Sequence, residues 1–423
     1  MFDGPTDDTD ERGLHAAQRL LRIAFVTETY PPEINGVAMS VARLVEGLHA
    51  RGHHLQLIRP RQPSACEVEV EAEAEAEASV RFEDVLTGAW PIPRYAGLRM
   101  GAPSRHMLSR LWSARRPDVV HIATEGPLGW SAMQAARQLK LPVTADFRTN
   151  FHAYGKHYRM SWLARPIDAY LRAFHNLAHC TMVPTEALRR QLAARGFERL
   201  YVVGRGVDTR LFDPRRRSPA LRRHWGARPE DLVVASVGRL APEKNLAVVL
   251  KAYEGVRQLL PSARLLLVGE GPLREHLRAH CPSAHFAGQR RSEDLAAHYA
   301  SADLFLIPSL TETYGNVTAE AMASGLPVLA FDCAAAAELI RPGRNGMLVA
   351  GADGDDYERA AMALAADPQR RAAIGAAARA SVLGRGWDSV VQNFEALLVQ
   401  AVDAPAAGPG VAWTDTPRPS PMT

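Results

Sequence analysis

The chain has 423 residues, of which 47% are hydrophobic and 23% charged, and its formal net charge is +4. This length exceeds what one hydrophobic core usually supports, so two domains are expected, and the small net charge gives no reason to expect nucleic-acid binding. Four widely spaced cysteines contain no CxxC pair, which argues against a zinc ribbon or disulfide framework and suits a reducing cytoplasm. No apolar run approaches the ~20 residues that span a bilayer, and the acidic N-terminus lacks a signal-peptide core, so any membrane contact is expected to be peripheral.

The first half of the chain predicts a parallel α/β domain. A short apolar strand at 23–26 is followed by a loop, a helix that begins at Gly36 and ends near Gly52, and a second strand at 55–58. This order of strand, glycine-bearing loop, helix and strand is typical of a βαβ unit. Further strands are expected at 119–123, 143–146 and 180–183.

The second half repeats this alternation of strands and helices. Strands are expected at 233–237, 263–268, 285–287, 304–307 and 328–331, with helices between them. Two such halves predict two doubly wound parallel sheets that face each other across a cleft.

Domain boundaries follow from changes in composition. We expect a disordered N-terminus at 1–20, a first domain at 21–205, a second domain at 206–385, a C-terminal helix at 386–402 that packs back on the first domain, and a disordered tail at 403–423. Residues 62–79 place Glu at alternate positions, which predicts a solvated acidic insertion. An arginine-rich, proline-flanked stretch up to about Pro229 is interpreted as the interdomain linker.

The segment from Pro308 to Pro327 is the most informative part of the chain. An apolar strand leads into a loop that contains Glu312, and a helix that opens near Gly315 carries Glu320 in its second turn. A strand, a loop and a helix N-terminus in this order form a cradle for an anion. The two glutamates can accept hydrogen bonds from hydroxyls at two ends of a phosphorylated ligand. The alternative is an ordinary helix cap followed by a surface glutamate.

This segment resembles the carboxylate signature of the retaining nucleotide-sugar glycosyltransferases of family four. Those enzymes have the GT-B fold, in which two Rossmann-like domains face each other. The resemblance runs from about Arg22 to about Leu398, with several motifs in the family's order. It implies transfer of a hexosyl group, mannose or glucose, from a nucleoside-diphosphate sugar to a hydroxyl of a lipid or glycan, with retained anomeric configuration. The segment around 311–337 is most similar to bacterial enzymes that act on lipids, and GDP-mannose is the first expectation for the donor.

The resemblance assigns the donor side to the second half. Its segment from Gly238 to Asn245 matches a family motif in which Arg239 and Lys244 clamp the diphosphate; the alternative is a solvated basic loop. Glu312 is expected to hold the sugar and Glu320 the ribose. The remaining donor contacts that the family pattern implies are Gly36, Gly238, the amides around Gly315, Asn316 and Val317, and, at the nucleobase, Gly288 and Gln289.

The first half is expected to supply the acceptor side through His121, Glu125 and Asn150. Many relatives place a histidine beside the donor sugar where this chain has Arg148. Either His152 replaces that histidine or Arg148 itself contacts the leaving phosphate, and both readings stay open.

No metal or other cofactor is expected. The acidic run from Asp353 to Asp356 lies in a polar turn before a helix, far along the chain from the other motifs. Two cations and helix amides can neutralise a leaving diphosphate without a divalent ion. Gly269 and Gly271 suggest a dinucleotide fingerprint, but the required third glycine is replaced by Arg274.

Membrane contact is expected to involve residues 94–116, where arginines alternate with apolar side chains. The alternative is an amphipathic helix that packs on its own sheet. Two other functions also remain open at this point: a non-catalytic nucleotide-sugar-binding protein, and a nucleotide-sugar epimerase with the same two-domain architecture.

Overall fold

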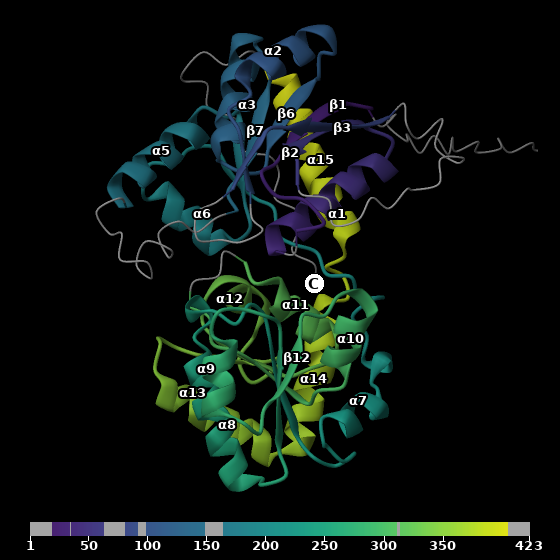
Figure 1. Ribbon diagram of the computed structural model, residues 1–423, viewed down its shortest axis with the longest axis vertical. Helices are drawn as coiled ribbons and strands as arrows, with labels where there is room; N and C mark the ends of the chain where they lie inside the picture. Colours follow the sequence, from purple (N-terminus) through teal and green to yellow (C-terminus); the bar gives the residue numbers. More distant parts are fainter. Residues whose placement is uncertain are drawn as a thin grey trace, which may run out of the picture.

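A computed structural model describes residues 19–33, 35–62, 81–91, 99–148, 164–310 and 314–404. Two parallel sheets, each covered by helices on both faces, form two α/β domains that lie one above the other in Figure 1. The expected acidic insertion, apart from Gln62, lies outside these ranges. So do three residues with predicted roles, namely Asn150, His152 and Glu312.

The first sheet has seven parallel strands in the order β3-β2-β1-β6-β7-β8-β9. Their bounds are β1 Arg22–Val26, β2 His54–Pro60, β3 Phe82–Thr87, β6 Val119–Ile122, β7 Val143–Asp146, β8 Cys180–Val183 and β9 Leu200–Val202. The strand order reverses between β1 and β6, which places a topological switch point at their carboxyl ends. Strand β3 is not predicted from the sequence because it is a half-buried edge strand with charged residues, and it becomes a strand by pairing with β2.

In the described ranges, the first domain also contains five helices and a hairpin. The helices are α1 Gly36–Ala50, α2 Arg105–Ala114, α3 Pro127–Gln138, α5 Ala164–Asn176 and α6 Glu186–Ala193, and the antiparallel hairpin consists of β4 Ala89–Pro91 and β5 Arg99–Gly101. Helix α1 begins where the sequence predicts because Asn35 caps it, its side-chain oxygen accepting a hydrogen bond of 2.8 Å from the Ala38 amide.

The second sheet has six parallel strands in the order β12-β11-β10-β13-β14-β15. Their bounds are β10 Val233–Val237, β11 Arg264–Val268, β12 His285–Gly288, β13 Leu304–Ile307, β14 Val328–Phe331 and β15 Met347–Val349. The helices are α8 Leu246–Leu259, α9 Arg274–His280, α10 Ser292–Ala300, α11 Asn316–Ala323, α12 Ala334–Leu339, α13 Gly354–Ala366 and α14 Pro368–Val382. Strands β13 and β14 are buried along their full length, since helices cover both faces of the sheet.

The arginine-rich stretch belongs to the second domain, so the interpretation of it as a linker is wrong. It contains a 3-10 helix, η2 Pro214–Arg216, and the short helix α7 Pro219–His224. Arg222 is only 4% exposed and donates hydrogen bonds to the carbonyl oxygens of Ser301 (2.9 Å) and Asp231 (2.6 Å). A buried guanidinium that donates these hydrogen bonds fixes the stretch to the domain.

The last helix, α15 Trp387–Asp403, packs on the first domain and is the yellow helix among purple and blue elements in Figure 1. Its Phe394 is buried against Phe25 of β1, with ring centroids 6.1 Å apart. The two crossings of the chain between the domains are joined by a hydrogen bond of 3.0 Å from the Val207 amide to the Arg385 carbonyl. The second domain is therefore connected to the first by two adjacent segments.

His53, next to the first helix, has the structural role that its position in a helix-to-strand turn suggests. The imidazole is fully buried and accepts a hydrogen bond of 3.1 Å at Nδ1 from the Leu21 amide. Its Nε2 lies 3.0 Å from a carboxylate oxygen of Glu395 on α15. Because Nδ1 is the acceptor, Nε2 carries the proton and donates to Glu395. This contact fastens α15 to the first domain.

Candidate functional site

A pocket lies at the switch point of the second sheet, where β10 and β13 end side by side. In open α/β sheets this is the position at which ligands bind. Helix α8 follows β10 and helix α11 follows β13, so both helices begin at this edge. The lining residues come from the segments between each strand and its helix: Ser236, Val237, Gly238, Arg239, Leu240, Lys244, Leu246, Ile307, Pro308, Ser309 and Val317.

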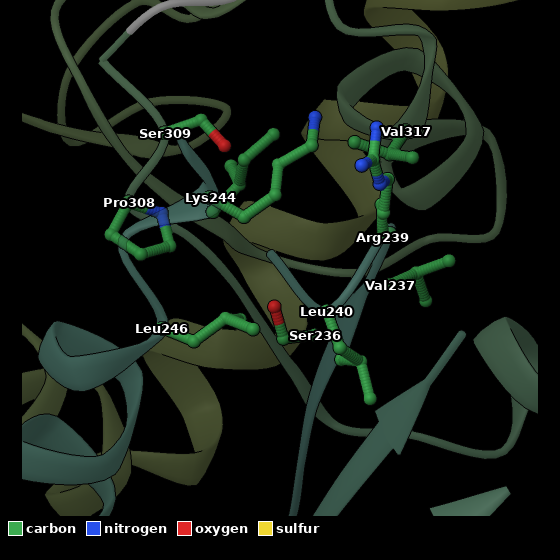
Figure 2. A pocket seen from close by; sticks show the side chains of 11 residues that line it. Ser236, Val237, Arg239, Leu240, Lys244, Leu246, Pro308, Ser309 and Val317 are labelled. Atoms are coloured by element: carbon green, nitrogen blue, oxygen red, sulfur yellow. The ribbon is translucent and has the colours of Figure 1, made fainter. Parts of the chain in front are cut away.

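Two cations from one loop line this pocket. Figure 2 shows the ends of the Arg239 and Lys244 side chains on the same side of it, with Val317 beside Arg239. Gly238 has φ +151°, which an L side chain rarely adopts, so a glycine is required where the loop leaves β10. Arg239 is 40% exposed, and its Nη1 lies 3.7 Å from Glu243. The predicted basic loop is therefore part of a concave site rather than a convex surface.

The neighbouring loops are held against this basic loop by small residues. A Cβ at Gly269 would collide with the Gly238 carbonyl oxygen, and one at Gly271 with that of Leu240. The Leu240 amide donates a hydrogen bond of 2.9 Å to the Glu270 carbonyl. The two glycines that suggest a dinucleotide fingerprint therefore allow close packing of two backbone segments. The spacing of these glycines indicates that another backbone segment lies close to them. The fold shows that this segment is the basic loop after β10.

Asn245 links the two halves of the pocket, although the sequence pattern alone gives it no role. Its φ of 52° places it in the left-handed region, directly before α8. Its side-chain amide donates a hydrogen bond of 3.3 Å to the Pro308 carbonyl beyond β13. This contact sets the basic loop relative to the loop that leads to α11.

The N-terminus of α11 opens on the same pocket. Gly315 has φ 92° and precedes Asn316 and Val317, which form the first turn. Among the described residues, no side chain caps this helix. Amides in the first turn of a helix have no partner within the helix and carry partial positive charge, which favours an anion.

Glu320 lies one turn further along α11 and forms a pair with Tyr299 of α10. The tyrosine hydroxyl donates a hydrogen bond of 2.9 Å to Oε2 of Glu320. Burial of the carboxyl group raises the pKa of Glu320 to about 7, and the hydrogen bond from Tyr299 offsets only part of this effect. Glu320 can therefore exist in both protonation states near neutral pH.

The first domain meets α11 through the N-terminus of α1. A Cβ at Gly36 would lie 3.7 Å from Nδ2 of Asn316, and that nitrogen is 3.5 Å from the Ser40 hydroxyl. The structure thus brings together two residues with predicted donor contacts, Gly36 and Asn316, from opposite domains. Gly288 and Gln289 lie at the carboxyl end of β12, where the Gly288 carbonyl accepts a hydrogen bond of 2.8 Å from Gly269.

Two of the residues expected on the acceptor side, His121 and Glu125, are buried in the structure. His121 is fully buried on β6, with Phe25 and Phe394 at ring-centroid distances of 4.6 and 4.7 Å. Glu125 is 4% exposed, and its Oε1 lies 3.2 Å from Nε2 of His175. Both side chains therefore have partners within the first domain, and their acceptor roles stay predictions.

Arg148 follows β7 and is 4% exposed. It forms an ion pair with Asp146, the last residue of that strand. Burial alone would raise the pKa of Asp146, but the Arg148 cation and a hydrogen bond from His121 hold it well below its usual value. The side chain that replaces the family histidine is therefore an interior cation of the first domain.

Within the described ranges, no group of three or more His, Cys, Asp or Glu side chains is arranged to hold a metal ion. The acidic run before α13 has other partners. Asp353 caps that helix by accepting a hydrogen bond of 2.8 Å from the Asp355 amide. Asp355 pairs with Lys251, and Asp356 pairs with Arg359.

Two family models match the chain. Residues 231–367 match "Glycosyl transferases group 1", and residues 34–211 match "Glycosyltransferase Family 4". The first match contains the pocket, and the second contains the N-terminus of α1 that faces it.

The chain is also similar to named proteins. A "GDP-mannose-dependent alpha-mannosyltransferase" of Mycobacterium tuberculosis is 36% identical over 382 residues, covering 89% of this chain and 97% of that protein. An "Alpha-monoglucosyldiacylglycerol synthase" of Acholeplasma laidlawii is 26% identical over 353 residues, covering 77% of this chain and 84% of that protein. Among solved structures, sucrose-phosphate synthase from Thermosynechococcus elongatus has a TM-score of 0.72 at 20% identity, covering 90% of this chain and 99% of that one. An Anabaena protein in complex with UDP-glucose has a TM-score of 0.66 at 19% identity, covering 90% and 100%. The two solved structures share the fold of this chain.

Proposed function

The chain belongs to the family 4 glycosyltransferases, and on that premise we propose that its donor is GDP-mannose and its acceptor a lipid. The reaction is transfer of a hexosyl group from a nucleoside-diphosphate sugar to a hydroxyl of a lipid or glycan, with retention at the anomeric carbon. The observation that carries the proposal is the pocket at the switch point, where two cations and a helix N-terminus converge. The mannosyltransferase name of the mycobacterial relative supports the choice of donor sugar.

The diphosphate of the donor would bind between the basic loop and α11. Negative charge on the diphosphate grows as the glycosidic bond breaks. Groups fixed in place before the reaction stabilise that charge in the transition state more than in the ground state. Arg239 and Lys244 would supply the positive charge, and the amides of Asn316 and Val317 would donate hydrogen bonds. This arrangement favours cleavage without a bound metal.

The sugar and the nucleoside would lie on either side of the diphosphate. Glu320 would accept hydrogen bonds from the ribose, and Glu312, which is outside the described residues, keeps its predicted role at the sugar. Gln289 is exposed at the end of β12 and would lie near the nucleobase. In this scheme the departing phosphate takes the proton of the acceptor hydroxyl on the same face of the sugar. The chain then needs no separate general base.

A donor panel tests this proposal. Purified protein is incubated with GDP-mannose, GDP-glucose, UDP-glucose or UDP-galactose and a bacterial lipid extract, and sugar transfer is followed by mass spectrometry. We expect kcat/KM for GDP-mannose to exceed that of each other donor by at least about tenfold, equivalent to about 1.4 kcal/mol. A preference for a UDP-sugar would contradict the donor assignment while leaving the reaction class intact. Transfer by none of the donors would contradict the proposal as a whole.

Peripheral membrane contact is proposed for helix α2. Leu108 and Trp112 on its inner face are fully buried in the first domain, so part of its apolar surface serves its own sheet. The outer face carries Met107, which is 37% exposed, and a row of exposed cations. Of those cations, Arg105 and Arg110 belong to α2, and Arg115 and Arg116 directly follow its last residue. A surface of this kind suits electrostatic attraction to anionic lipid more than deep insertion.

Among helices in the described ranges, none combines the length and the apolarity needed to cross a bilayer. Vesicle co-sedimentation tests the surface contact. The wild-type protein should pellet with phosphatidylglycerol vesicles and not with phosphatidylcholine vesicles, and 0.5 M NaCl should release it. Replacing Arg105 and Arg110 with Glu should abolish pelleting, whereas the same change at exposed Arg344 of the second domain should not. Equal pelleting of all variants would contradict a role for α2.

A further inference from the structure

Two buried arginines of the first domain lie outside the pocket described above. Arg148 follows β7, and Arg205 lies where the chain passes toward the second domain; they are 4% and 8% exposed. The hydroxyl of Tyr314, which directly precedes Gly315, donates a hydrogen bond of 3.3 Å to the Arg205 carbonyl. The arginine pair therefore lies next to the loop that leads into α11.

The charges around this pair do not balance. Asp146 forms an ion pair with Arg148 and supplies one negative charge. His121 lies 3.5 Å from Asp146, and burial lowers its pKa, so it is neutral at pH 7. Among the described residues, Asp146 is thus the carboxylate whose charge acts on both arginines. Because arginine stays protonated in proteins, the second positive charge must be stabilised in some other way.

The hydrogen-bonding groups of the pair are also incompletely used. None of the three guanidinium nitrogens of Arg148 has a well-formed hydrogen bond, although all three are buried. Burial and the neighbouring Arg148 lower the pKa of Arg205 to about 9, which reflects an unfavourable environment for its charge. A buried cation without a full set of acceptors destabilises the folded state. Such a cost is characteristic of a site that is completed by a ligand.

We propose that Arg148 and Arg205 form an oxyanion-binding subsite of the first domain, which receives a phosphate or carboxylate group of a ligand in the cleft. The proposal rests on the proposed function, because that reaction brings two sources of such a group. One is the diphosphate of the donor, gripped by Arg239 and Lys244 from the opposite domain. The other is an anionic group on the acceptor. In both cases the ligand supplies the missing negative charge and draws the two domains together.

The Arg205→Gln variant isolates this role. It removes the uncompensated charge and leaves the ion pair of Asp146 and Arg148 intact. If the pair exists for ligand binding, the ligand-free variant should be at least as stable as the wild type, with an unfolding temperature higher by roughly 2 °C. If Arg205 instead holds the domains together structurally, the unfolding temperature should fall. The control is Arg344→Gln, a change at an exposed arginine of the second domain.

Calorimetry with defined probes then identifies the source of the oxyanion. If it is the donor, Arg205→Gln should weaken GDP binding by roughly 10- to 100-fold and leave guanosine binding unchanged. If it is the acceptor, GDP binding should be unchanged. With GDP present, methyl glucuronide should then bind the wild type more tightly than methyl glucoside does, and Arg205→Gln should remove this difference.

The same titrations can overturn the inference. If Arg205→Gln binds GDP, guanosine and both hexosides as the wild type does, the subsite does not exist. If the wild-type protein itself binds no GDP, the proposed function fails, and this outcome is distinct from a failure of the subsite alone.

Discussion

The two domains place a helix N-terminus at the same topological position and use it in opposite ways. In the first domain α3 begins at the switch point between β1 and β6, and in the second α11 begins between β10 and β13. Glu28, just after β1, accepts a hydrogen bond of 2.9 Å from the Leu128 amide in the first turn of α3 and another from the Gly101 amide. The corresponding position of α11 has no side-chain cap from the described residues and faces the pocket.

This difference identifies the donor-binding domain on physical grounds. An anion is favoured at each helix N-terminus, but in the first domain the protein's own carboxylate already occupies that position. In the second domain Arg239 and Lys244 add positive charge beside the uncapped helix. The fold alone would allow an anion at either helix N-terminus, whereas the described side chains leave only the N-terminus of α11 open to one.

The sharpest test of this comparison is the removal of the two cations of the pocket. Arg239→Gln and Lys244→Gln should each lower kcat/KM by about 10²- to 10³-fold, equivalent to about 2.7–4 kcal/mol of transition-state stabilisation. Both side chains belong to a partly exposed loop, so the free energy of unfolding should change by less than about 0.5 kcal/mol. Steady-state kinetics and urea unfolding measure the two quantities. Full activity in both variants would refute the assignment of the diphosphate to this pocket.

The opposite pattern is expected at Glu28. Glu28→Gln replaces a carboxylate that accepts amide hydrogen bonds, and it should lower the free energy of unfolding by about 1–3 kcal/mol. Activity per folded molecule should fall by less than about threefold, since the cap faces its own helix and not the donor. Glu46→Gln on the outer side of α1, where the side chain is 61% exposed, is the matched control. A large loss of activity without loss of stability would mean that the N-terminus of α3 also takes part in donor binding.

The fold was predictable from the sequence to the extent that strands are buried on both faces. The predicted bounds of β7, β8, β10, β13 and β14 match the structure because continuous apolar runs mark their ends. The GT-B fold and the glycosyl-transfer function inferred by resemblance are confirmed. The edge strand β3 and the helix α7 could not be predicted, because their stability comes from tertiary pairing and from buried arginine contacts.

The candidate site was predictable where function depends on backbone position. Gly36, Gly238 and Gly315 each lie between a strand and a helix, and that position alone places them at the carboxyl edge of a sheet. Side-chain roles are harder because a polar residue can turn inward to meet a distant partner. His121 and Glu125 do so, with partners 25 and 50 residues away in the chain, and nothing in the sequence marks those pairs.

A smaller effect, on the pH dependence of stability, is expected from Glu320 in the second domain. Its pKa is raised to about 7 by burial, so the folded protein holds a proton that the unfolded chain has lost above pH 4.5. Stability should therefore decline as pH rises from about 5 to 7, and Glu320→Gln should reduce this decline. Urea unfolding at pH 5 and pH 7.5 measures it. Tyr299→Phe, which removes the donated hydrogen bond, should shift the decline to higher pH, whereas identical pH profiles for all three proteins would contradict the assigned pKa.

The smallest effect is expected from removal of metal ions. If Arg239, Lys244 and the amides of α11 neutralise the departing diphosphate, 5 mM EDTA should change the rate of transfer by less than about twofold. An excess of MgCl₂ should then lower the rate through screening and competition for the diphosphate, rather than raise it. A loss of tenfold or more in EDTA, restored by Mg²⁺ or Mn²⁺, would show that the two cations are insufficient. In that case a metal ion bound with the donor would supply a third positive charge to the diphosphate, in addition to Arg239 and Lys244.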